Sequence, residues 1–364
     1  MAVAACSCFG AEPAAKEKQP RMEVCFVLDT TSSMSGLIEG AKQKIWSIAN
    51  QMVNAKPTPE LKLALIGYRD RGDEYITRLF DLTDDIDAIY EKLRAFSANG
   101  GGDTPESVNQ ALDEAVHKIS WSQDRDVLKL IFLVGDSPPH MDYKDDVKYP
   151  DTCLKAVKKD LIINTVQCGT TAETKPIWQD IARRSEGNYS AISQTGDMVA
   201  IATPMDGEIA ELNRAIGKTL VAYGSEGDRR AVAAKQSASE VSAAPAMADR
   251  LSYNMRTRKS VQGGGELLDA VAEGRVKLDD VKGEELPPEL QKLTAEERNA
   301  FVEKKQAERA ELRKKLTDLI AKRDAYVEAE KKRVAGSGKR DAFDETVNET
   351  IRAQAARKGI AYEK

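Results

Sequence analysis

The pattern of apolar and polar residues changes near residue 220. Before that point, short apolar runs typical of buried strands alternate with stretches whose apolar residues recur at helical spacing. The apolar runs occupy residues 24–28, 61–68, 75–82, 127–134, 161–167 and 187–192. Because strands and helices alternate, we expect an α/β domain over residues 21–222 with a doubly wound, mostly parallel six-stranded sheet.

One connection in this domain is too short for a parallel crossover. The runs 61–68 and 75–82 are joined by the turn-like residues 69–73. A crossover between parallel strands needs a dozen or more residues, whereas antiparallel strands can be joined by a tight turn. The pattern therefore predicts one antiparallel strand, at an edge of the sheet.

The second half of the chain shows only helical periods. Residues 223–262 are rich in Ala, Ser, Glu and Arg without a clear apolar period, which predicts a flexible linker before a helical region over residues 263–364. A capping box at Thr294–Glu297 opens a long helix, 294–334, and a final helix is expected at 340–358. Leu312, Leu316 and Leu319 form a narrow apolar seam. We expect the final helix to fold back on this seam, with self-association through the long helix as the alternative.

Charge and cysteine content exclude several classes of function. The net charge is −5, and no clustered basic face is evident, so a nucleic-acid partner is not expected. The chain has five cysteines without a C-x-x-C pair and two histidines, which argues against a zinc site or a disulfide framework. No apolar run is long enough to span a membrane.

The first 20 residues form a separate leader. Residues 1–11 are small and apolar, and residues 3–6 resemble a bacterial lipoprotein cleavage box that would place a lipid on Cys6. We therefore expect an exported or cell-envelope protein whose only membrane contact is this lipid. The alternative is a cytoplasmic protein with an irregular leader.

Candidate chemistry gathers where strands end. Asp29 follows the first strand and is succeeded by Thr31 and Ser33, and Asp136 follows the strand at 127–134. Thr104 lies in a glycine-rich segment before a helix, where Pro105 suits the first helical position and Thr104 the N-cap. In an open α/β sheet, ligands bind at the carboxyl ends of the strands. These hard oxygen ligands favour Mg²⁺, with Mn²⁺ or Ca²⁺ as substitutes.

The order of these residues resembles the von Willebrand factor type A (vWA) domain and its metal-ion-dependent adhesion site. The similarity rests on D-x-T-x-S after the first strand, G-G-D-T-P-E before a helix and G-D after a later strand. By position, the resemblance implies Asp29, Thr31, Ser33, Thr104 and Asp136 as metal ligands. Thr31 replaces the commoner serine and keeps the hydroxyl. The resemblance also implies that a protein partner donates a carboxylate to the metal, and that the output is binding without catalysis.

Two other classes of function compete with this interpretation. Asp29 and Gly135-Asp136 superficially resemble motifs of haloacid dehalogenase phosphohydrolases, but most phosphatases of that type carry an acid two residues after the nucleophile, where this chain has Thr31. The third hypothesis is a helical scaffold protein in which the metal is incidental. The same five residues could also be helix caps and turn hydroxyls without an ion.

Overall fold

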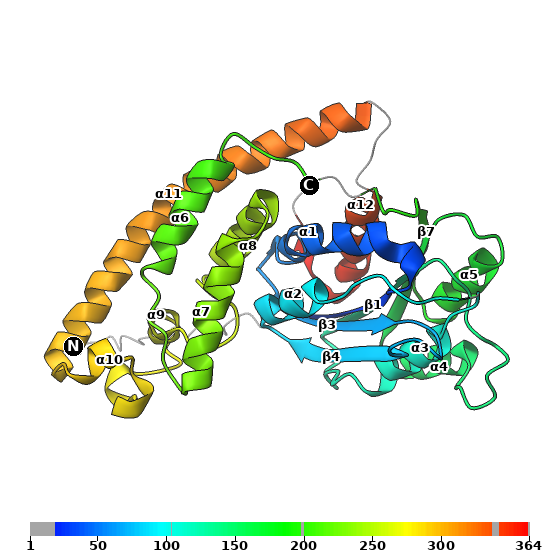
Figure 1. Cartoon of the computed structure of the whole chain (residues 1–364), viewed down its shortest axis with the longest axis horizontal. Coiled ribbons are helices and arrows are strands. Elements are labelled where there is room, and N and C mark those ends of the chain that lie inside the picture. Colours follow the sequence, from blue (N-terminus) through cyan, green and yellow to red (C-terminus); the bar gives the residue numbers. More distant parts are fainter. Residues whose placement is uncertain (1–18, 103, 198–199, 337–341, 363–364) are drawn as a thin grey trace, which may run out of the picture.

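The computed structural model describes residues 19–102, 104–197, 200–336 and 342–362. A sheet domain and a helical arm, the latter built from α6 to α11, lie side by side (Figure 1). Residues 1–18 of the expected leader, including Cys6, lie outside the described residues. None of the described helices is long and apolar enough to cross a membrane.

The predicted six-stranded sheet is confirmed, and its order is β4-β3-β1-β5-β6-β7. All pairings are parallel except that of β3 with β4, so the predicted antiparallel edge strand is also present. The strands are β1 (Arg21–Asp29), β3 (Glu60–Tyr68), β4 (Thr77–Thr83), β5 (Leu128–Gly135), β6 (Ile162–Cys168) and β7 (Tyr189–Ile192). A separate small ladder joins β2 (Ala55–Lys56) to β8 (Ala361–Tyr362).

Helices cover both faces of the sheet because its central strands are apolar on both sides. One face carries α1 (Ser35–Met52), α2 (Ile86–Arg94) and α12 (Ala342–Ala355). The other carries α3 (Val108–His117), α4 (Tyr149–Lys158) and α5 (Thr174–Arg184). Phe26 and Phe132 stack at the centre of the first face, with ring centroids 5.5 Å apart.

The helical arm combines one long helix with several shorter ones. It contains α6 (Asp206–Gly217), α7 (Glu226–Glu240), α8 (Ala244–Arg256), α9 (Leu267–Ala272), α10 (Pro288–Gln291) and α11 (Ala295–Gly336). Short 3-10 turns lie at η1 (Ser32–Met34), η2 (Leu278–Asp280), η3 (Gly283–Glu285) and η4 (Ala356–Lys358). The 42 residues of α11 give a length of about 63 Å.

The prediction of an irregular linker over residues 223–262 does not hold. Helix α7 begins with a capping box between Ser225 and Asp228, and α8 packs along α1. Helix α8 buries small residues and the guanidinium of Arg250, which binds Asp87 on α2 through two hydrogen bonds of 2.6 and 2.9 Å. Met247 and Leu251 are buried on the same helix, but this short apolar period does not stand out within a stretch rich in alanine and serine.

The predicted partner of the final helix is also wrong. Phe343, Val347 and Ile351 of α12 are buried against α1 and the sheet. The seam of α11 packs on α6 and α8 instead, where Leu316 and Leu319 are buried. An apolar stripe fixes which side of a helix is covered but does not identify the surface that covers it.

Candidate metal centre

Asp29 and Asp136 meet at the carboxyl edge of the sheet, as the sequence predicts. Strands β1 and β5 are parallel neighbours, with Leu28 opposite Val134, and each delivers its aspartate to the same rim. A pocket of about 290 Å³ opens beside them. Four of the five predicted ligands line it, namely Thr31, Ser33, Thr104 and Asp136. Asp29 is fully buried directly behind Thr31.

Asp29 uses only one of its carboxylate oxygens within the protein. Its Oδ1 accepts hydrogen bonds from the backbone N–H of Thr31 (2.9 Å) and from Thr31 Oγ1 (2.6 Å). Its Oδ2 is buried without a hydrogen-bond partner. Burial and, secondarily, the charge of Asp136 raise the pKa of Asp29 to about 7. Without a cation nearby, ionisation of Asp29 is therefore disfavoured, and a bound cation would favour its charged form.

The loop after β1 arranges the hydroxyls. Thr31 precedes the 3-10 turn η1, and its Oγ1 lies 3.3 Å from Ser33 Oγ. Thr30 turns the other way, with Oγ1 donating to the carbonyl of Tyr68 (2.9 Å). Thr31 and Ser33 line the pocket, in agreement with the spacing of the motif, and Ser32 between them donates its hydroxyl to the carbonyl of Gly100.

Thr104 lies at the mouth of the pocket, but it does not cap a helix. Helix α3 begins at Val108, with Ser107 in the N-cap position, so the expectation that Pro105 starts the helix is wrong. Glu106 forms a bridge with Pro139, and Ser107 Oγ donates to Asp70 Oδ1 (2.8 Å). These bonds hold the segment extended, which delays the helix and leaves Thr104 exposed at the rim.

The glycine-rich loop reaches the rim through a left-handed turn. Gly100 has φ +77°, and a Cβ at this position would lie 2.2 Å from Asp73 Oδ1. The carbonyl of Gly100 accepts hydrogen bonds from the backbone N–H of Ser32 (3.2 Å) and from Ser32 Oγ (2.8 Å). Glycine is required here, and the turn binds the Thr104 loop to the loop after β1.

Glu106 is a rim residue that sequence reasoning missed. Its side chain lines the pocket, is 3% exposed and has an Oε2 without a hydrogen-bond partner. Burial raises the pKa of Glu106 to about 9, and the nearby charges of Asp29, Asp70, Asp73 and Asp136 act in the same direction. An acidic residue shortly after a Thr-Pro pair is common in the first turn of a helix, so the sequence around Glu106 did not mark it as a site residue. The glycines before it were the available signal.

Gln194 is a second missed residue, on the loop after β7. Its Nε2 donates to Asp136 Oδ2 (2.7 Å) and to the carbonyl of Ser33 (3.2 Å). Ser137 Oγ donates to Asp136 Oδ1 (3.0 Å). The amide thereby connects the two aspartate-bearing loops, and no local sequence pattern marks it.

The donor set fits a hard divalent cation. It consists of carboxylates and hydroxyls, with unpartnered oxygens on Asp29 and Glu106. Such ligands suit Mg²⁺ or a similar ion better than zinc, which favours Cys and His. Within the described residues, no group of three or more His, Cys, Asp or Glu side chains is arranged to hold a metal, so the hydroxyls are needed to complete the set.

Comparison with known proteins identifies relatives of the sheet domain. The von Willebrand factor A domain-containing protein 7 of Rattus norvegicus is 34% identical over 120 residues, which is 33% of this chain and 12% of that protein. An ariadne-like RING finger protein of Acanthamoeba polyphaga mimivirus is 27% identical over 127 residues, which is 34% of this chain and 12% of that protein. The chain thus matches about an eighth of the length of these relatives.

Among solved structures, one neighbour is proximal thread matrix protein 1 from the mussel byssus, with a zinc-occupied MIDAS motif. It is 18% identical with a TM-score of 0.39, and the match covers 48% of this chain and 42% of that chain. The SpRpn10 VWA domain is 14% identical with a TM-score of 0.37, over 48% of this chain and 89% of that chain.

The family match covers the whole rim described above. The family model for the von Willebrand factor A domain matches residues 23–204, half of the chain, and extends from within β1 to beyond β7. The chain therefore belongs to the von Willebrand factor A domain family.

Proposed function

We propose that this vWA domain binds a divalent cation, preferentially Mg²⁺, and uses it to hold an acidic side chain of a protein partner. The supporting observation is the group of buried carboxylates at the rim, in which Asp29 Oδ2 has no partner and no lysine or arginine lines the pocket. Buried charges in proteins are normally paired or bound to metal.

Each predicted ligand has a defined part in this proposal. Asp29 and Asp136 supply negative charge, and Thr31, Ser33 and Thr104 supply neutral oxygens. A bound cation would provide a positive charge with an exchangeable coordination position. Because the pocket is open to solvent at Thr104 and the glycine loop, a carboxylate on a partner could approach it from that side.

The arrangement supports binding over catalysis. Thr31 stands where most phosphohydrolases of the haloacid dehalogenase type carry an acid, and its hydroxyl is donated to Asp29 Oδ1. Proton transfer to a leaving group needs a positioned acid, which Thr31 cannot be. The helical scaffold hypothesis is less favoured because the seam of α11 packs within the chain.

The experiment is a calorimetric titration of the full chain with MgCl₂, followed by capture of partners from a native extract with and without EDTA. Asp29→Ala and Asp136→Ala should abolish both Mg²⁺ binding and the EDTA-sensitive capture. Glu211→Ala, on the exposed side of α6, removes one carboxylate away from the rim and should change neither. A partner captured equally by all variants, with or without EDTA, would contradict the proposal.

A further inference from the structure

The main sheet has an open edge at β7. Among the described residues, this strand pairs only with β6, in parallel. The N–H of Thr165 donates to the carbonyl of Asn188 and that of Gly169 to the carbonyl of Ile192, both at 2.9 Å. Because backbone groups alternate along a strand, Tyr189 and Ala191 direct their N–H and C=O groups away from β6. No described residue outside β6 hydrogen-bonds to these backbone groups.

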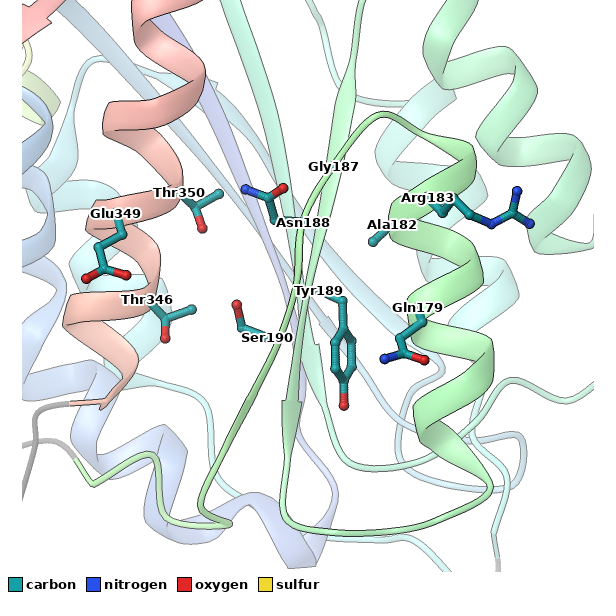
Figure 2. A pocket seen from close by; sticks show the side chains of 10 residues that line it. All are labelled: Gln179, Ala182, Arg183, Gly187, Asn188, Tyr189, Ser190, Thr346, Glu349 and Thr350. Carbon is teal, nitrogen blue, oxygen red and sulfur yellow. The ribbon is translucent and has the colours of Figure 1, made fainter.

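A groove of about 650 Å³ runs along this edge. Figure 2 shows the strand segment passing between α5 and α12, whose side chains form the two walls. Helix α5 contributes Gln179, Ala182 and Arg183, and α12 contributes Thr346, Glu349 and Thr350. The walls are mostly polar, so the groove does not resemble a site for an apolar helix.

The two walls differ in charge. On the α5 wall, Arg183 shares Asp180 with Arg184, so two arginines face one carboxylate. On the α12 wall, Glu349 is exposed and makes no ion pair with any described residue. A segment lying in the groove would therefore meet an unpaired carboxylate on the α12 side and a net positive charge on the α5 side.

We propose that the β7 edge accepts an extended segment of a partner protein as an added strand, with a lysine or arginine of that segment facing Glu349. An added strand would lie about 4.8 Å from β7, and four of its residues would extend about 13 Å. Backbone hydrogen bonds to Tyr189 and Ala191 supply affinity, and the alternate side chains that face α12 supply specificity. None of the groove residues lines the metal pocket, so this binding is independent of the proposed cation.

A second copy of the chain is a poorer occupant than a single extended segment. Helices α5 and α12 flank β7 on both sides. If two copies paired through β7, each would bring its own pair of flanking helices toward the other. A single extended segment brings no flanking helices and fits between α5 and α12.

The test uses the full chain in EDTA, which removes any contribution of the metal site. The probe is a fluorescein-labelled, end-blocked peptide of eight residues in which threonine and lysine alternate, and binding is measured by anisotropy. The matched probe replaces each lysine with glutamate. The lysine peptide should bind at least about tenfold more tightly than the glutamate peptide, because only the former is attracted by Glu349.

Two variants separate the charge from the backbone. Glu349→Lys should reverse the preference between the two peptides. Ala191→Pro should weaken the lysine peptide about tenfold or more, because proline removes one outward N–H and is tolerated on edge strands. Glu345→Lys makes the same charge change on α12 outside the groove lining and should leave binding unchanged. Circular dichroism checks that each variant folds.

Several results would overturn the proposal. One is failure of the lysine peptide to bind the unmodified chain, and another is equal binding to the Glu349→Lys variant. A third is a dimer in sedimentation velocity that Ala191→Pro abolishes, since the edge would then be occupied by a second copy.

Discussion

Buried carboxylates occur both at the sheet rim and in the helical arm, and the two regions treat them differently. In the arm, Glu266 and Asp269 are buried against Arg309 of α11, which donates to Glu266 at 2.8 and 3.0 Å and to Asp269 at 3.0 Å. At the rim, Asp29, Glu106 and Asp136 are buried near one another, and the nearby charges that raise the pKa values of Asp29 and Glu106 are other carboxylates.

This difference distinguishes a structural group of charges from a ligand site. A buried ion pair with its hydrogen bonds satisfied fixes how elements pack, as Arg309 fixes α11 on α9 and on the loop before it. A group of buried carboxylates without a cation is costly unless it is protonated or a cation is bound. Both regions bury carboxylates, so burial alone does not distinguish them. They differ in whether a positively charged side chain lies beside the carboxylates.

The largest effect is expected in the arm. Arg309→Met would leave Glu266 buried without its cation and Asp269 with only Arg313, and it should lower the free energy of unfolding by about 3 to 5 kcal/mol. Urea denaturation followed by circular dichroism measures this loss. Lys314→Met, at an exposed position of the same helix, should change stability little. A loss below about 1 kcal/mol for Arg309→Met would show that the ion pairs of Arg309 do not stabilise the fold.

At the rim, loss of a charged side chain should weaken metal binding and leave stability unchanged. Asp29→Asn keeps the acceptor that Thr31 uses but removes a charge, so Mg²⁺ affinity should fall at least about a hundredfold, or ~2.7 kcal/mol. The metal-free protein should not be destabilised, because Asp29 Oδ2 has no partner to lose. Calorimetry and urea denaturation in EDTA measure the two quantities. A variant that loses stability and retains metal binding would reverse the assignment of the rim.

The pH dependence of stability should also mark the rim. A carboxyl group whose pKa is higher in the folded state binds its proton more tightly there, so its stabilising effect is complete at low pH and is lost as pH rises through the folded pKa. The pKa is raised from 3.8 to about 7 for Asp29 and from 4.5 to about 9 for Glu106. In EDTA, stability should therefore fall between pH 5 and pH 9, by up to about 1.4 kcal/mol per pH unit for each group that is protonated in the folded state alone.

The matched control is the double variant Asp29→Asn, Glu106→Gln, in which this fall should be much smaller. Urea denaturation at several pH values provides the measurement. If the double variant keeps the full slope, the titrating groups lie elsewhere in the molecule.

The smallest effect is expected for Gln194→Ala. The amide orients Asp136 and the loop that carries Ser33, without contributing charge to the rim. Loss of such an orienting group should weaken Mg²⁺ binding about tenfold. Gln194→Glu keeps the size of the side chain but adds a negative charge, so comparison of the two variants by calorimetry separates orientation from charge. No change in either variant would exclude Gln194 from the site.

Much of the sheet domain was predictable from the sequence because its strands are continuous apolar runs and its helices have clear stripes. Asp29 and Asp136 could be placed at one rim because parallel strands end at the same edge. Glu106 and Gln194 could not be found in this way. Their roles depend on an extended segment before α3 and on a loop that returns after β7, and neither has a local signature.

The helical arm was less predictable for the same physical reason. Helix α8 buries Arg250 against Asp87, which are 163 positions apart in the sequence, and such a pair leaves no period in the chain. The stripe of α12 was visible, but the stripe of α11 and the face of the sheet were both apolar surfaces that could have covered it. Only the packed structure distinguishes between them.

The sequence by itself determined the strands, the one antiparallel edge, the long helix and the order of five oxygen-bearing residues, because these depend on local period and on where strands end. Tertiary structure decided which carboxylates share a neutralising cation and which do not. It also decided that β7 remains open between α5 and α12. Charge balance and edge exposure depend on residues brought together from distant parts of the chain, and local pattern does not record them.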